Sequence, residues 1–227
     1  MKKYVIIVAG GSGTRMNKDI PKQFINLNGK PILMHTIEKF QRSIQPLEII
    51  LVLSKQYNEE WKQLCEKYSF NLQHQLVEGG ETRYHSVKNG LELVVNGSIV
   101  GIHDAARPLV SKKTIIDAYT VAEEKGNAIP SIPIRDSIRF VKKKESVAVD
   151  RTKYVTIQTP QCFQSDLIKK AFLKAYKPEF TDDATVLEAF GEPINLIEGN
   201  SENIKITIPM DLVIAEALLL HHPDLLN

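Results

Sequence analysis

Residues 4–16 read YVIIVAGGSGTRM, an apolar stretch that runs straight into a loop with three glycines. A nearly continuous apolar run of this length is typical of a strand that other elements cover on both faces. Glycines directly after such a strand let backbone N–H groups approach phosphate oxygens, and the residues after them can begin a helix whose N-terminus favours anions. This stretch therefore predicts an α/β fold with a phosphate-binding loop after its first strand.

Alternating strand and helix patterns continue along the chain. Short apolar runs predict further strands at 48–53, 72–77, 99–102, 194–197 and 203–207. Apolar residues spaced three and four apart predict helices that begin at Pro31 and that cover 84–94, 115–122, 165–176, 181–190 and 209–220. This order is typical of a mostly parallel sheet with helices on both faces. No repeat or low-complexity linker interrupts it, so residues 1–227 are predicted to form a single domain.

Residues 137–156 break the alternation. Two extended stretches, 137–141 and 147–150, flank the charged segment KKKES at 142–146. Extended segments joined by a short polar stretch are typical of a β-hairpin. The pattern predicts a hairpin arm with a polar turn that projects from the α/β body.

Composition excludes several classes of protein. The chain has 227 residues, of which 43% are hydrophobic, and a formal net charge of +2, which argues against disorder and against a nucleic-acid coat protein. No apolar run approaches the roughly 20 residues that cross a bilayer, and the first one is too short for a signal peptide. The two cysteines lie far apart without a CxxC pair, which suggests a reducing compartment. We therefore expect a cytoplasmic protein without nucleic-acid or membrane partners.

Two common phosphate motifs fail at the glycine loop. A dinucleotide fingerprint needs a third glycine where this chain has Met16. The second predicted strand also ends without an acidic residue that could hold a ribose. Both observations count against an NAD(P) oxidoreductase. A Walker loop would need glycine and Ser or Thr where Phe24 and Pro31 stand. The cations Arg15 and Lys22 follow the loop and suit a nucleoside triphosphate. A nucleotide-binding protein without catalytic activity remains an alternative.

Further blocks match one family in order and spacing. They are AGG-x-G-x-RM at 9–16, PKQ at 21–23, GGETRYHSV at 79–87, HDAARP at 103–108, DR at 150–151, QTPQ at 158–161, TDDA at 181–184 and NIKIT at 203–207. The first two resemble the sugar-nucleotide and alditol-phosphate nucleotidyltransferases. The whole series resembles the 2-C-methyl-D-erythritol 4-phosphate cytidylyltransferases over about residues 3–220. Ribitol 5-phosphate cytidylyltransferases share the loop and the TPQ and NIK blocks and stay as the alternative.

The resemblance implies a fold and a reaction. The fold is Rossmann-like, of the nucleotide-diphospho-sugar transferase type. In the reaction, a phosphate oxygen of the phosphorylated alditol attacks the α-phosphorus of CTP in line and pyrophosphate leaves, within non-mevalonate isoprenoid precursor biosynthesis. Both reactants are polyanions, so the site must supply fixed cations, hydrogen-bond donors and a divalent cation, Mg²⁺.

The resemblance also implies roles for individual residues. CTP would be bound by Ala9, Gly10, Gly11, Gly13, Gly80, Ser86 and Ala105. The catalytic residues at the phosphates would be Arg15, Lys22, Arg151 and Lys205. The second substrate would be contacted by Asp104, Arg107, Ser137, Arg151, Thr181 and Asp182, with Asp104 also holding Mg²⁺.

The same family likeness implies a homodimer. In the family the hairpin reaches into a second subunit, so Arg151 would serve the partner's site. Ser137 stands near a position where the family has a threonine. From the residues themselves, His103 beside Asp104 is predicted to be structural, and Thr181 is predicted to begin a helix as its cap.

Overall fold

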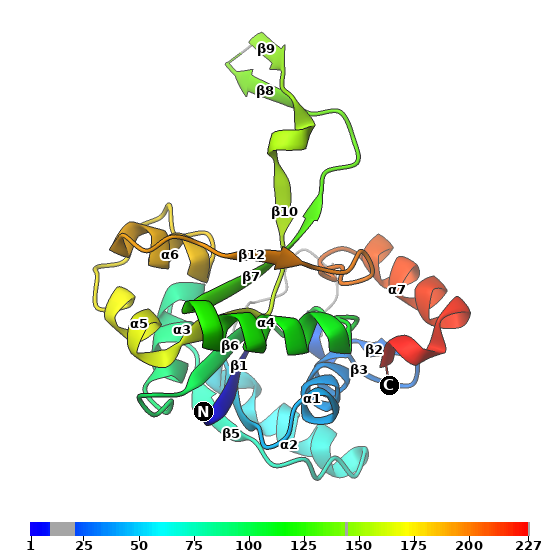
Figure 1. Cartoon of the computed structure of the whole chain (residues 1–227). Helices are drawn as coiled ribbons and strands as arrows, with labels where there is room; N and C mark the ends of the chain where they lie inside the picture. The colour runs from blue at the N-terminus through cyan, green and yellow to red at the C-terminus, as the bar shows by residue number, and fades with distance from the viewer. Residues whose placement is uncertain (10–20, 144, 227) are drawn as a thin grey trace.

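An eight-stranded sheet forms the centre of the molecule (Figure 1). The computed structural model describes residues 1–9, 21–143 and 145–226, so the glycine loop at 10–20 lies outside the described residues. The strands run in the order β10-β7-β11-β6-β1-β4-β5, and β12 also pairs with β7. Their bounds are β1 Lys3–Val8, β4 Glu48–Leu53, β5 Gln75–Glu78, β6 Ile99–Asp104, β7 Asn127–Pro133, β10 Val155–Ile157, β11 Gln161–Gln164 and β12 Leu196–Glu198.

The first strand lies inside the parallel half of the sheet. Val8 at its end pairs with Val52 of β4 on one side and with Asp104 of β6 on the other. β5 continues this half in parallel, whereas β11 pairs antiparallel with both β6 and β7. The prediction of a mostly parallel sheet is confirmed. The other half is mixed because it contains β7, β10 and β11, three strands that were not predicted from the sequence.

Helices cover both faces of the sheet, as predicted. One face carries α1 (Ile32–Ser43), α2 (Asn58–Lys67) and α4 (Lys112–Lys125), and the other carries α3 (Arg83–Leu91), α5 (Ser165–Ala171) and α6 (Asp183–Phe190). Ile7 of β1 packs on the first face with Phe40 of α1, and Ile6 packs on the second face with Val87 of α3. Side chains of a strand alternate between faces, so a strand buried on both reads as one unbroken apolar run.

The last helix and several short elements form a smaller cluster beside the sheet. Leu219 and Ala215 of α7 (Pro209–His221) pack there with Leu27 and Ile206. The remaining short elements are η2 Lys22–Phe24, β2 Asn26–Leu27, β3 Lys30–Pro31, η3 Lys55–Tyr57, η4 Arg151–Lys153 and η5 Pro223–Leu226. In the described ranges, every helix is too short or too polar to cross a membrane.

Several predicted boundaries are wrong. Residues 203–207 form no strand. The backbone N–H of Ile206 donates to the backbone oxygen of Ala106, but this bond does not continue into a ladder of strand pairing. The helix predicted at 165–176 ends at Ala171, and Pro31 precedes α1 instead of opening it. α6 begins two residues later than predicted, because Asp182 rather than Thr181 caps it.

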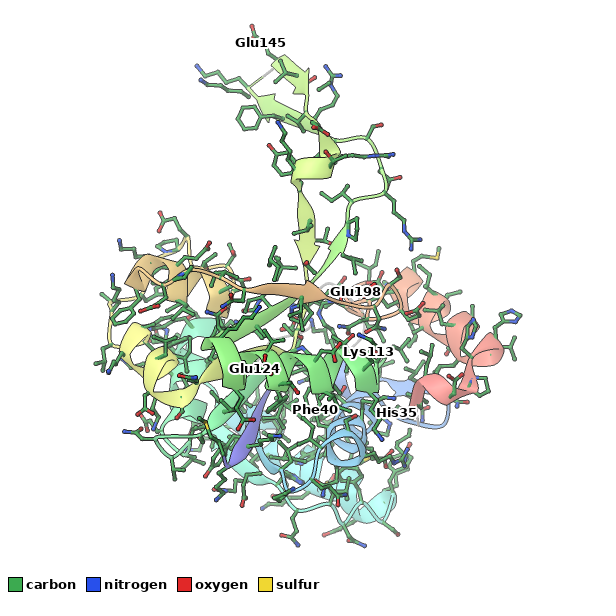
Figure 2. The ribbon with its side chains drawn as sticks, in the orientation of Figure 1. His35, Phe40, Lys113, Glu124, Glu145 and Glu198 are labelled. Carbon is green, nitrogen blue, oxygen red and sulfur yellow. The ribbon has the colours of Figure 1, made fainter. Side chains whose placement is uncertain are left out.

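The predicted arm is present and projects from the sheet (Figure 1). β7 and β10 pair to form its stem, and β8 (Arg139–Lys142) pairs with β9 (Glu145–Ala148) at its tip. Figure 2 shows the side chains of this arm extending outward as far as Glu145. The turn is tighter than the predicted polar segment 142–146, because Lys142 already pairs with Glu145. The arm exposes apolar side chains, with Phe140 at 59% and Val141 at 66%.

Candidate active site

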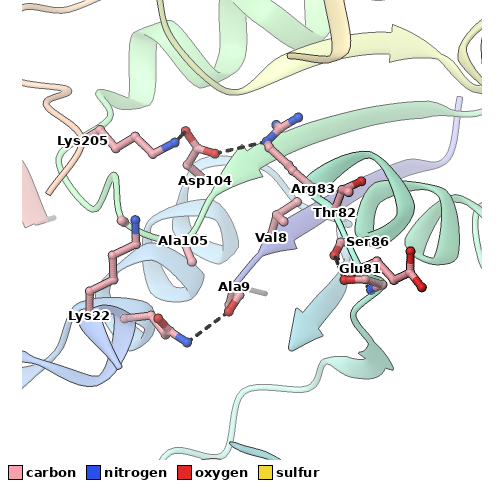
Figure 3. Close-up of a pocket in the computed structure, with 13 residues that line it drawn as sticks. Val8, Ala9, Lys22, Glu81, Thr82, Arg83, Ser86, Asp104, Ala105 and Lys205 are labelled. Atoms are coloured by element: carbon pink, nitrogen blue, oxygen red, sulfur yellow. Dashed lines mark hydrogen bonds and ion pairs between the residues drawn. The ribbon is translucent and has the colours of Figure 1, made fainter. Parts of the chain in front are cut away.

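A cavity of about 420 Å³ opens at the carboxyl ends of β1 and β6 (Figure 3). It is lined by Val8, Ala9, Lys22, Gln23, Gly80, Glu81, Thr82, Arg83, Ser86, Asp104, Ala105, Ala106 and Lys205. Ligands of open α/β sheets bind at this edge, and the volume lies in the usual range for small-molecule sites. The position and size of the cavity make it the candidate active site.

The cavity gathers much of the predicted set. Among its lining are the predicted Ala9, Lys22, Gly80, Ser86, Asp104, Ala105 and Lys205. The predicted Gly10, Gly11, Gly13 and Arg15 lie outside the described residues. Arg107 is not among the lining residues but contacts Asp104, which is. The others do not line the cavity of this chain: Ser137 and Arg151 lie exposed on the arm, Thr181 is exposed, and Asp182 caps α6.

Asp104 is the electrostatic centre of the cavity wall. Its Oδ2 atom lies 3.0 Å from Nζ of Lys205 and 3.3 Å from Nε of Arg107, and its Oδ1 atom lies 3.6 Å from Nε of Arg83. Burial by itself would raise the pKa of Asp104, but these three cations outweigh it and hold the pKa well below its usual range. Asp104 is therefore ionised at neutral pH and surrounded by positive charge.

The segment around Asn203 brings Lys205 and Arg107 to Asp104. The Asn203 side chain is buried and donates to the backbone oxygen of Thr159 at 2.9 Å, while its own backbone oxygen accepts from Arg107 at 2.7 Å. The neighbouring Ile206 anchors in the α7 cluster. Lys205 thus reaches the cavity from an irregular segment that is held at several points, and not from the predicted strand.

A tight corner places Gly80 and Ser86 at the opposite wall. The backbone N–H of Gly80 donates to Oγ of Ser86 at 3.1 Å, and Thr82 caps the N-terminus of α3. A Cβ atom on Gly80 would lie 2.4 Å from Cβ of His85, closer than real atoms approach. Only glycine fits this corner without a shift of the α3 backbone, which gives the GG-x-x-R-x-x-S block a physical reason.

Gln23, the residue after Lys22, ties η2 to the end of the first strand. Its side chain is buried and donates to the backbone oxygen of Ala9 at 3.0 Å, as the dashed line from Ala9 in Figure 3 shows. Lys22 lies next to it in η2 and lines the cavity. The PKQ block therefore positions a cation beside the strand that leads into the glycine loop.

Arg83 lines the cavity but was not among the site residues predicted from the sequence. Its guanidinium makes a two-pronged hydrogen bond with the carboxylate of Asp183, at 2.9 and 2.6 Å, and it also lines the cavity. Burial alone would lower the pKa of Arg83, but Asp183 and Asp104 outweigh it and raise the pKa. The sequence signal was its place in the GGETR block, but nothing local paired it with a carboxylate a hundred residues away.

His103 has the structural role that was predicted for it. The ring is fully buried, packs edge-on against Phe40, and has Nε2 3.1 Å from the backbone oxygen of Arg107 and Nδ1 3.0 Å from Oγ1 of Thr159. Burial lowers the pKa of His103 to about 3, so the ring is neutral at pH 7. With both nitrogens engaged inside the protein, His103 supports the backbone beside Asp104.

Asp182 and Thr181 begin α6 in a different way from the prediction. Asp182 accepts from the backbone N–H of Thr185 and forms a capping box with it, and its other oxygen accepts from Gln161 at 2.8 Å. Thr181 stands outside the helix and is exposed. The prediction that Thr181 is the cap is therefore wrong, because the aspartate next to it occupies that position.

Comparisons with known proteins agree with this geometry. The family model described as 2-C-methyl-D-erythritol 4-phosphate cytidylyltransferase matches residues 3–221. A relative of that name from Bacteroides thetaiotaomicron is 50% identical over 219 residues, which cover 96% of this chain and 100% of the relative. Another of that name from Clostridium novyi is 41% identical over 223 residues, covering 96% of each. The crystal structure of the Francisella tularensis protein of that name matches with a TM-score of 0.79 at 34% identity, covering 96% of this chain and 99% of that one.

Proposed function

Because the chain belongs to the 2-C-methyl-D-erythritol 4-phosphate cytidylyltransferase family, we propose that the cavity at the ends of β1 and β6 is its catalytic site. The protein is a nucleotidyltransferase of isoprenoid precursor biosynthesis. It joins CTP and 2-C-methyl-D-erythritol 4-phosphate to give the cytidine diphosphate product and pyrophosphate. The matches do not favour the ribitol 5-phosphate alternative. CTP is an intracellular nucleotide, and we place the enzyme in the cytoplasm.

The observation that carries the assignment of the site is the positive charge around Asp104. Lys205 and Arg83 line the cavity on either side of this carboxylate, and Lys22 reaches the same cavity from η2 (Figure 3). Two polyanionic substrates repel each other, and fixed cations in a partly enclosed site offset that repulsion. A cavity of this charge suits two phosphorylated ligands better than an uncharged metabolite.

The residues divide the work of binding and transfer. Gly80, Ser86 and Ala105, which line the cavity, would contact the nucleoside part of CTP. Lys22, together with Arg15 outside the described residues, would stabilise negative charge that grows on the α-phosphate and on the leaving pyrophosphate. Lys205 would hold the attacking phosphate in line, a task of orientation that can contribute strongly to the rate. No side chain needs to act as a nucleophile.

Two acidic residues of the described chain line the cavity, Glu81 and Asp104, and the family resemblance assigns Mg²⁺ to Asp104. In the described part of the chain, no cluster of three or more His, Cys, Asp or Glu side chains could hold a metal. Asp104 supplies a cavity-facing carboxylate, and Mg²⁺ is often bound by one or two carboxylates plus substrate phosphates. A protein site of one acid therefore fits Mg²⁺ that arrives with CTP. When bound, the ion would neutralise phosphate charge.

We propose a homodimer in which the arm completes the partner's site. Arg151 lies exposed on this arm, where its guanidinium donates to the backbone oxygen of Arg135. Phe140, Val141 and Val147 expose apolar surface at the tip, which a second subunit would bury. Ser137, Thr181 and Asp182 would then contact substrate only in the assembled dimer.

Mixed dimers test this arrangement. Arg15→Ala and Arg151→Ala subunits are each expected to be nearly inactive alone. After exchange of equal amounts, about half of the dimers are mixed, and each mixed dimer has one intact site of two. The mixture should therefore recover about a quarter of wild-type activity. Native mass spectrometry of isotope-labelled subunits would verify the exchange. Exchange without recovery would contradict a site shared between subunits.

A paired substrate assay tests the activity itself. Pyrophosphate release should require CTP, Mg²⁺ and 2-C-methyl-D-erythritol 4-phosphate together, and should be much slower with ribitol 5-phosphate. A higher kcat/KM with ribitol 5-phosphate would overturn the substrate assignment and leave the reaction type standing. CTP binding without turnover of either alditol phosphate would support a non-catalytic binding protein.

A further inference from the structure

We propose that Arg83 is a positioning residue that holds the Asp104 carboxylate in its working orientation. The inference rests on the proposed role of Asp104 at the substrate phosphates. It adds to the site a chain of ion pairs in which Arg83 connects Asp104 at the end of β6 with Asp183 at the start of α6.

The contacts of Asp104 are divided between its two oxygens. Lys205 and Arg107 both contact Oδ2. Among the ion pairs of the described residues, Arg83 is the cation on the Oδ1 side, opposite Lys205 (Figure 3). With Arg83 removed, attraction from one side would turn the carboxylate toward Lys205 and Arg107. Arg83 thus balances the pull of the other two cations and sets the rotation of the carboxylate.

Arg83 is itself held rigidly. Its backbone opens α3 directly after the cap Thr82, and its guanidinium is fixed by two hydrogen bonds to Asp183, whose side chain is only 1% exposed. Two parallel bonds between a guanidinium and a carboxylate fix orientation as well as distance. A side chain anchored in this way presents its Nε atom to Oδ1 of Asp104, 3.6 Å away, from a fixed direction.

Asp183 stands in the first turn of α6, where a carboxylate suits the helix dipole, but among the described residues it caps none of the backbone N–H groups there. The N-cap of α6 is Asp182, and the backbone N–H groups of Asp183 and Ala184 are already satisfied by Oε1 of Gln161 at 3.0 and 2.9 Å. Both carboxylate oxygens of Asp183 instead accept from Arg83. The capping hydrogen bonds of α6 therefore do not use the Asp183 carboxylate, whose two oxygens are both engaged by Arg83.

The competing explanation is that Arg83 only neutralises Asp183. Arg83→Gln alone cannot separate the two, because it leaves a buried carboxylate without a partner and can destabilise the fold. The double variant Arg83→Gln/Asp183→Asn removes that charge with a side chain of the same shape. Its melting temperature should return close to the wild-type value. Its kcat/KM for 2-C-methyl-D-erythritol 4-phosphate should stay about 10²-fold low, as expected for a misplaced catalytic group.

A second background tests whether Arg83 acts through Asp104. In Asp104→Asn protein, the further change Arg83→Gln/Asp183→Asn should lower kcat/KM by less than about threefold, since the group to be positioned is gone. The dissociation constant of CTP, measured by calorimetry, should change little when Arg83→Gln/Asp183→Asn is added to either background. Arg42→Gln is the matched control, because Arg42 pairs with Glu38 on α1 and does not line the cavity.

Three results would overturn the proposal. Wild-type kcat/KM in Arg83→Gln/Asp183→Asn would mean that Arg83 only compensates Asp183. An equal loss in the wild-type and Asp104→Asn backgrounds would mean that Arg83 acts on the substrate directly. Full activity of Asp104→Asn would remove the premise, and with it the role assigned to Asp104 under the proposed function. In contrast, an inactive Asp104→Asn beside an unimpaired double variant would leave that function intact and refute the inference alone.

Discussion

Acidification should destabilise the fold through His103. Its ring is 0% exposed, and burial lowers its pKa from 6.5 to about 3. The unfolded chain therefore binds a proton near pH 6.5, whereas the folded protein binds it only near pH 3. Between these values the unfolded state holds more protons, so stability is fully present above pH 6.5 and is lost as the pH falls below it.

The size of the effect follows from the shift. Each pH unit inside this window costs about 1.4 kcal/mol of unfolding free energy. Going from about pH 6.5 to about pH 5 should thus remove about 2 kcal/mol through this single side chain. For a domain of this length, that loss corresponds to about 4–8 °C in melting temperature.

Denaturant unfolding at several pH values would measure it. Carboxylates also respond to acid, so the test is the difference between wild type and His103→Gln, which keeps a donor for the Arg107 oxygen but cannot titrate. The variant should be less stable at neutral pH, and its stability should fall by about 2 kcal/mol less between about pH 6.5 and pH 5. His221→Gln, an exposed position at the end of α7, serves as control. Parallel pH profiles for wild type and His103→Gln would refute a neutral buried histidine.

Three further predictions concern the site. Lys22→Ala should lower turnover by about 10²–10³-fold with little change in melting temperature, as for the loss of one transition-state donor. Lys62→Ala, at an exposed position of α2, should leave turnover unchanged. Normal turnover in Lys22→Ala would remove that residue from the reaction. Gly80→Ala should cost about 1–3 kcal/mol of stability in urea unfolding, because the Cβ atom of the alanine would overlap His85. The same change should weaken CTP binding in calorimetry. Wild-type stability together with wild-type CTP affinity would show that the corner adapts. Chelation of divalent ions should stop pyrophosphate release and added Mg²⁺ should restore it; activity that survives exhaustive chelation would exclude a metal requirement.

Much of the parallel half of the fold could be predicted because its signals are local. The runs at β1 and β4 are apolar on both faces, and the glycine at position 191 ends α6 in a left-handed conformation. β11 was missed because Gln161 and Gln164 flank its short apolar centre, and the partners that satisfy these glutamines come from distant segments. The false strand at 203–207 shows the reverse, since apolar alternation there reflects burial of Ile206 without a neighbouring strand.

The candidate site was predictable to the extent that it rests on motif residues. Lys22, Gly80, Asp104 and Lys205 were all selected from sequence blocks and lie together at one cavity. Arg83 was missed although it stands in one of those blocks, because its importance comes from its two carboxylate partners.

By itself, the sequence determined the class of this protein: an apolar strand, glycines after it, and blocks whose order is that of one family of cytidylyltransferases. These features can be recognised from the sequence alone, because strands, caps and tight corners depend on neighbours in the chain. Only the tertiary structure decided which charges meet. Arg83, Arg107 and Lys205 surround Asp104 because α3, the end of β6 and the Asn203 segment converge at one edge of the sheet. Coulomb interactions depend on distance in space, and sequence spacing does not report that distance.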